Sequence, residues 1–188
     1  MMDQPLAGKT IAILVANGFE ETEMTEPQRA LLKTGATLKV ISPEQGLVNG
    51  WHGKAWGHYF PVDQQVVEVL AADFDMLILP GGERSVAKLA GNAHVRRIIG
   101  GFMDGGKPVA AIDDGVSLIA VAQKIKGRTV SASPAVREAL EAAGAVWSDE
   151  PLTIDKALLT ADGLDTLPTF VDQLVKAFSE AAQVKKAA

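Results

Sequence analysis

The chain has 188 residues and no cysteine. It can therefore form no disulfide, no thiolate metal site and no thiol-based catalytic centre. Its formal net charge of −5 lacks the basic excess with which proteins neutralise nucleic-acid phosphates. No apolar run approaches the roughly 18 residues of a membrane-spanning helix, and the first residues lack the basic and apolar regions of a signal peptide. We expect a cytoplasmic protein with neither a nucleic acid nor a membrane as partner.

Patterns that bind metals or cofactors are missing as well. Only three histidines occur, and His52 and His58 lie six residues apart in a glycine-containing aromatic segment, which is not a zinc spacing. The glycine pairs at 100–101 and 105–106 precede a strand, the wrong order for a phosphate loop or a dinucleotide fingerprint. We expect no metal and no cofactor. The aromatic segment is interpreted as a loop at a subunit interface or at the rim of a pocket, and His94 as the start of a surface helix.

Short apolar runs alternate with segments of helical periodicity along the whole chain. Buried strands separated by helices indicate a mostly parallel sheet covered on both faces, a three-layer α/β sandwich. We expect one domain over residues 1–188, with a core at about 9–180 and frayed ends that include 184–188. The predicted strands are 10–15, 37–42, 76–79, 108–112, 128–131, 145–147 and 157–159, and the predicted helices are 23–34, 93–103, 115–124, 134–143 and 164–182.

Residues at the ends of the strands are the candidates for chemistry, because ligands of such sheets bind outside the carboxyl ends of the strands. The segments in question are 16–21, 80–85 and 113–115. The last is the most informative, since the apolar run 108–112 ends abruptly in Asp113, Asp114 and a glycine before an apolar helix-like segment. A sharp strand-to-helix turn of this kind often displays a nucleophile, and here its tip carries Asp113.

The chain carries, in order, the stretches Gly18-Phe19-Glu20-Glu21-Thr22-Glu23, Thr25-Glu26-Pro27, Trp56-Gly57, Phe60-Pro61-Val62-Asp63, Leu79-Pro80-Gly81-Gly82 and residues 106–112. Together these stretches resemble the ThiJ/PfpI superfamily. This superfamily is related to the class I glutamine amidotransferases, and the chain resembles its PfpI-like branch. The resemblance covers about residues 9–178 and implies a flavodoxin-like fold assembled as a homodimer or a higher homo-oligomer. It also implies relatives that include cysteine hydrolases, glyoxalases, deglycases, chaperones and stress proteins.

The resemblance also implies which positions carry the site. In such relatives the strand tip bears a cysteine, commonly followed by histidine, and a glutamate of the first loop lies beside the cysteine. Asp113 occupies the cysteine position, Asp114 the histidine position, and Glu20 matches the glutamate. In PfpI-like proteases, an acid after the double glycine, from a neighbouring subunit, completes a triad. Val86 falls near that place, with Glu83 close by.

A carboxylate is a weaker nucleophile than a thiolate toward amides and aldehydes, so cysteine protease, glyoxalase and deglycase chemistry is excluded at Asp113. Three hypotheses stay open. In the first, Asp113 faces Glu20 and shares a proton with it in a carboxylate pocket that includes Asp114. Such a protein would bind a small carbonyl or amine ligand, or serve in a stress response without turnover.

In the second hypothesis, Asp113 is the nucleophile or the general acid/base of a hydrolase or lyase. Backbone amides near Gly81, Gly82 and Asp114 would then form an oxyanion hole, and Gly81, Gly82 and Glu83 would contact the ligand. In the third, the site is degenerate. Ordinary structural roles compete with all of these, because Asp114 is also a typical N-cap for a helix starting near Gly115. A solvated helix start likewise explains most of the acids around Glu20.

Overall fold

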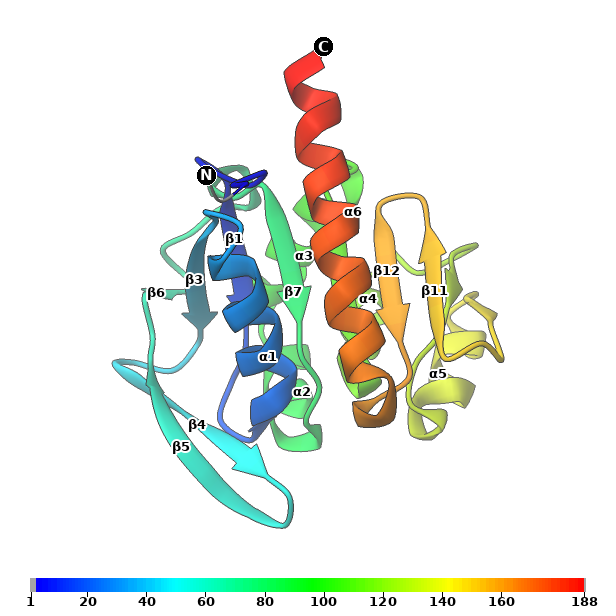
Figure 1. Ribbon diagram of the computed structural model, residues 1–188. Coiled ribbons are helices and arrows are strands. Elements are labelled where there is room, and N and C mark those ends of the chain that lie inside the picture. Colours follow the sequence, from blue (N-terminus) through cyan, green and yellow to red (C-terminus); the bar gives the residue numbers. More distant parts are fainter. Residues whose placement is uncertain (1–2, 188) are drawn as a thin grey trace.

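A central seven-stranded sheet organises the protein. The computed structural model describes residues 3–187, and its strands lie in the order β11-β12-β8-β7-β1-β3-β6 (Figure 1). All neighbours run parallel except β11, which is antiparallel to β12. The strands are β1 (Thr10–Leu14), β3 (Thr37–Ser42), β6 (Gln64–Gln65), β7 (Met76–Leu79), β8 (Val109–Ile112), β11 (Leu152–Asp155) and β12 (Leu158–Ala161).

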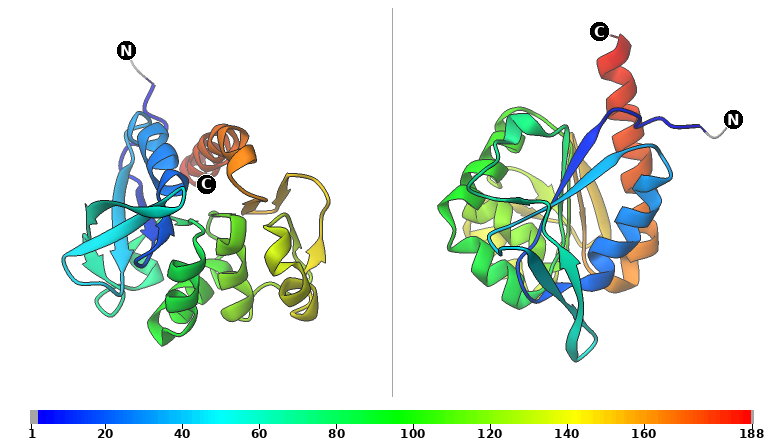
Figure 2. Two further views of the ribbon diagram at one scale, coloured as in Figure 1. Left: turned by 90° about the horizontal axis from the view of Figure 1, so that it is seen from below. Right: turned by 90° about the vertical axis from the view of Figure 1, so that its left-hand side faces the viewer.

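Helices cover both faces of the sheet, which Figure 2 shows edge-on. Successive side chains of a strand point to opposite faces. In β1, Ile11 and Ile13 pack with α1 and α6, whereas Ala12 and Leu14 join the core beneath the other helices. This explains the unbroken apolar runs and confirms the predicted flavodoxin-like sandwich. The helices are α1 (Glu21–Leu32), α2 (Glu83–Ala90), α3 (Ala93–Asp104), α4 (Ser117–Val121), α5 (Arg137–Ala142) and α6 (Leu167–Ala187), with single 3-10 turns at Ala71–Asp73, Asp113–Val116, Pro134–Val136 and Leu164–Thr166.

The aromatic segment is a hairpin, so its interpretation as a loop is wrong. Strands β4 (Leu47–His52) and β5 (Ala55–Pro61) pair antiparallel, and β4 also pairs with the short β2 (Phe19–Glu20). The glycines of the segment and its half-exposed side chains hid the alternation that marks a strand. A separate parallel pair joins β9 (Thr129–Val130) to β10 (Val146–Trp147).

The last helix is longer than the sequence predicts. The prediction ends it at residue 182 and expects a frayed tail, whereas α6 continues to Ala187. Residues 1–2 and 188 lie outside the described part of the chain. Between residues 3 and 187, none of the helices combines the length and the apolar character needed to cross a membrane.

Candidate functional site

Three loops meet at the carboxyl ends of β1, β7 and β8, which are neighbours in the sheet. The register places Leu79, the last residue of β7, beside Ala111 of β8. The backbone N–H of Glu20 donates to the carbonyl oxygen of Gly81 at 2.8 Å, which joins the first loop to the second. The segments predicted to carry the chemistry are therefore in one place.

Asp113 stands at the tip of β8 in an uncommon backbone conformation. Its φ of +60° lies in the left-handed region, which costs a residue with a side chain about 1–2 kcal/mol. A Cβ built on Gly115 would lie 2.6 Å from the carbonyl oxygen of Leu79 and 2.7 Å from that of Pro80. The turn thus passes so close to the end of β7 that only glycine fits there. Strain of this kind is found at functional sites.

The Asp113 carboxyl is half-buried and surrounded by other acids. Burial, followed by the charge of Asp114, raises the pKa of Asp113 to about 6. Hydrogen bonds from the Ser133 hydroxyl and the Asp114 amide oppose this shift, and the charge of Glu20 adds a smaller push upward. Asp113 is consequently an acid that titrates near neutrality, a property suited to proton transfer or to binding a cation.

Glu23, which the sequence analysis did not single out, is the buried acid of this site. It is fully buried, its Oε1 accepts the N–H of Gly81 at 2.9 Å, and its Oε2 has no hydrogen-bond partner. A Cβ on Gly81 would lie 2.7 Å from Glu23 Oε1 and 2.9 Å from the Cβ of Asp113, so both residues approach the same side of Gly81. Burial, and then the charge of Asp113, raises the pKa of Glu23 to about 9.

Helical spacing is the signal that could have separated Glu23 from the other acids. It precedes Pro27 by four residues and Leu31 by eight, and all three are buried residues of α1. Residues at this spacing share a helix face. The sequence match alone selected Glu20 instead.

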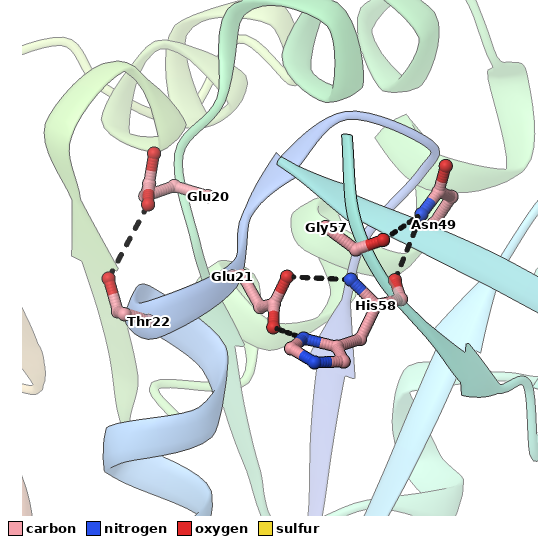
Figure 3. A network of polar contacts seen from close by, with 6 residues as sticks. All are labelled: Glu20, Glu21, Thr22, Asn49, Gly57 and His58. Atoms are coloured by element: carbon pink, nitrogen blue, oxygen red, sulfur yellow. Dashed lines mark hydrogen bonds and ion pairs between the residues drawn. The ribbon is translucent and has the colours of Figure 1, made fainter. Parts of the chain in front are cut away.

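Glu20 lies nearer the surface than Glu23. Its Oε1 accepts the Thr22 hydroxyl at 3.4 Å (Figure 3). Burial raises its pKa, although the Thr22 hydrogen bond and the nearby His52 oppose the shift and the charge of Asp114 adds to it. The fold thus brings Glu20 to the same acidic cluster, which we define as Glu20, Glu23, Asp113 and Asp114.

The interpretation of Asp114 as an N-cap is wrong. Its Oδ1 accepts the N–H of Gly82 at 2.7 Å, across the gap between two loops, and α4 begins only at Ser117 without a side-chain cap. The pKa of Asp114 is raised, mainly by burial, and the charge of the exposed Glu83 contributes. The amides of Gly81 and Gly82 are therefore both already engaged by carboxyl oxygens.

The β4–β5 hairpin is held next to this cluster by contacts between Glu21 and His58. The Glu21 carboxylate accepts the His58 amide at 3.0 Å and also contacts His58 Nδ1, while the Asn49 side chain donates to the carbonyl oxygens of Gly57 and His58 (Figure 3). Burial on its own raises the pKa of Glu21, but the hydrogen bonds from His58 outweigh it and lower the pKa overall. These contacts fix the hairpin against the start of α1.

Aromatic side chains of the hairpin also reach the start of α2. The guanidinium of Arg84 lies 4.4 Å from the centre of the Trp51 ring and 5.8 Å from that of Trp56, a cation–π arrangement. Val86, which the sequence match placed near the third catalytic position, is instead packed in the core. Within residues 3–187, no group of three or more histidine, aspartate or glutamate side chains is arranged to hold a metal ion.

The fold is an α/β sandwich with a strained turn after a central strand, where the candidate site lies. A family model described as the DJ-1/PfpI family matches residues 9–177. The chain belongs to the DJ-1/PfpI family.

Similar proteins carry several names. The chain is 35% identical to the Protein/nucleic acid deglycase 2 of Escherichia coli, over 86% of this chain and 93% of that protein. It is 34% identical to General stress protein 18 of Bacillus subtilis, over 87% and 94%. The crystal structure of a ThiJ/PfpI domain protein from Brachyspira murdochii superposes with a TM-score of 0.83 at 22% identity, covering 93% of this chain and 98% of that one.

Proposed function

We propose that this protein works without a thiol, as a stress-related or small-ligand-binding member of its family. Asp113 takes the place that a cysteine holds in the relatives that this chain resembles. The chain contains no cysteine that could supply a thiol from elsewhere. Cysteine protease, glyoxalase and deglycase activities that depend on such a thiol are then absent. The resemblance further supports a homodimer or a larger homo-oligomer.

The observation that carries the proposal is the Glu23 carboxyl, whose buried Oε2 has no hydrogen-bond partner and whose pKa is raised by burial and by the charge of Asp113. Two neighbouring carboxyls cannot both ionise cheaply in a buried site. With pKa values of about 9 for Glu23 and about 6 for Asp113, the pair carries one proton and one negative charge at pH 7. The charge is then concentrated on Asp113, which is the more accessible of the two.

Of the two ligand classes expected from the sequence, the site favours a protonated amine over a carbonyl compound. A carbonyl oxygen needs hydrogen-bond donors, and the amides of Gly81 and Gly82 are already taken. The charged groups that influence Asp113 are the acids Asp114 and Glu20. A small ammonium group would supply the positive charge that this cluster lacks.

The alternative is a hydrolase or lyase that uses Asp113. A pKa near 6 suits a general acid/base, which favours proton-transfer chemistry such as that of a lyase. A nucleophilic role is less well supported, because it needs free amide donors for the oxyanion.

Calorimetric titration with propylamine and with hydroxyacetone tests the proposal. Wild type is expected to bind propylamine at pH 7.5, at least tenfold more weakly at pH 5 as Asp113 is protonated, and to show no binding of hydroxyacetone. Asp113→Asn is expected to weaken propylamine binding at least tenfold, because hydrogen bonds to charged groups contribute about 1.5–3 kcal/mol. Asp172→Asn, an exposed site on α6, is the matched control and leaves binding unchanged.

Two other results would contradict this assignment. Tight binding of Mg²⁺ or Ca²⁺ that Asp113→Asn abolishes would identify a metal site instead of an ammonium site. Turnover of small esters, amides, hemithioacetals or isonitriles by wild type, lost in Asp113→Asn, would establish the enzymatic alternative.

A further inference from the structure

A hollow lies at the end of the sheet opposite the acidic cluster. It has a volume of about 500 Å³ and opens between the C-terminal half of α6, the β11–β12 turn and the residues that precede β8. Those are the amino-terminal ends of β8 and β12, whereas Asp113 follows the carboxyl end of β8. We call this hollow the α6 groove. Its apolar lining residues are Pro108, Ile154, Ala157, Leu158, Leu159, Ala177, Phe178, Ala181 and Val184.

Two residues of the apolar lining are largely exposed, whereas Leu158, Leu159 and Phe178 form its buried floor. Ile154 is 52% exposed and Val184 is 69% exposed, and they border one continuous hollow. Isolated apolar side chains on a surface are ordinary, but a gathered apolar hollow marks a place where something binds. The volume falls within the range of roughly 300–1,000 Å³ that small-molecule pockets occupy.

The charged residues at the groove indicate which kind of ligand it would bind. The groove is bordered by three lysines, Lys156, Lys176 and Lys185, and by one acid, Glu180. It is thus locally basic, although the chain as a whole is acidic. Lys156 stands at the β11–β12 turn, and the other two lie on α6. Among the described residues, none of these three lysines takes part in an ion pair. Three lysines outside ion pairs, with one acid among them, give the apolar groove an excess of positive charge that suits a ligand with an apolar body and an anionic end.

We propose that the α6 groove binds a free fatty acid, with its chain along the apolar lining and its carboxylate between the lysines. Long lysine side chains cover apolar surface with their stems while their ammonium groups stay in water, so they can meet a carboxylate at the rim. A second copy of the chain is the poorer occupant. A twofold contact at this groove would bring the lysines of one copy toward those of the other.

Decanoate is the probe, used below its micellar concentration and followed both by calorimetry and by the NMR signal of its ¹³C-labelled carboxyl. One decanoate is expected to bind per chain, and decyltrimethylammonium, with the same chain and the opposite charge, is expected to bind at least tenfold more weakly. Lys176→Glu should weaken decanoate binding at least tenfold. Lys186→Glu is the matched control, since Lys186 is exposed on the same helix but does not line the groove.

Each other outcome would overturn the proposal. Equal affinity for the two amphiphiles, or an unchanged affinity in Lys176→Glu, would show that the lysines do not recognise the carboxylate. An oligomer that Lys176→Glu dissociates in sedimentation velocity, with no decanoate bound, would make the groove a contact between copies. Binding to vesicles of anionic phospholipid without binding of free decanoate would make it a membrane contact. None of these results depends on the acidic cluster.

Discussion

Replacing Glu23 by glutamine is expected to remove most of the pH dependence of stability above neutrality. In the folded protein Glu23 keeps its proton until the pH reaches about 9, whereas its ordinary pKa is 4.5. Between those values the folded state binds one proton more than the unfolded state, so the free energy of unfolding falls as the pH rises, by up to about 1.4 kcal/mol per pH unit. The stabilising contribution is complete below pH 4.5 and lost as the pH approaches 9.

Urea unfolding between pH 6.5 and 8.5 measures this effect, because Asp113, with a pKa of about 6, is largely ionised over that range. Wild type should lose up to about 3 kcal/mol across these two units, and Glu23→Gln should lose far less. Glu20→Gln, which changes a less buried acid of the same cluster, is the control and should keep most of the wild-type slope, because burial is the main cause of the raised pKa of Glu23. An equally steep slope in Glu23→Gln would mean that Glu23 is already ionised at neutral pH.

Gly82→Ala is expected to destabilise the protein by about 3 kcal/mol or more, beyond the usual range for a surface substitution. Gly82 has a φ of +116°, and an added Cβ would lie 2.5 Å from the carbonyl oxygen of Gly18, 2.7 Å from the Glu20 nitrogen and 2.7 Å from the Phe19 Cα. All three are backbone atoms, which cannot move aside as a flexible side chain does. The loops after β1 and β7 would have to separate, and propylamine binding should be lost with them.

Gly106→Ala separates this crowding from backbone strain. Gly106 has a φ of +63°, but a Cβ there would meet nothing within 4 Å. Its substitution should therefore cost only the strain, about 1–2 kcal/mol. Urea unfolding of the two variants gives the comparison. Similar losses in both would show that the close approach of the two loops does not constrain residue 82.

The buried strands were predictable because both of their faces are covered. β3 and β7 have the predicted bounds, and the convergence of their loops follows from the parallel order of the sheet. The β4–β5 hairpin was not predictable in the same way. The residues of β5 are largely exposed on both faces, and the hairpin is held by partners distant in sequence, such as the contact between Glu21 and His58.

The acidic cluster was predictable in part. Asp113 could be placed at the tip because its strand and turn are local features. The role of Asp114 could not, since its partner, the Gly82 amide, lies 32 residues away. Helical spacing places Glu23 on the buried face of α1, but its contact with the Gly81 amide, 58 residues away, could not be predicted.

The most direct test of the proposed carboxyl pair is a carbon-detected NMR titration of the side-chain carboxyls of Glu23 and Asp113 in the wild-type protein. The pair predicts one transition above pH 8 for Glu23 and one near pH 6 for Asp113. Two ordinary transitions near pH 4, as in model peptides, would contradict it.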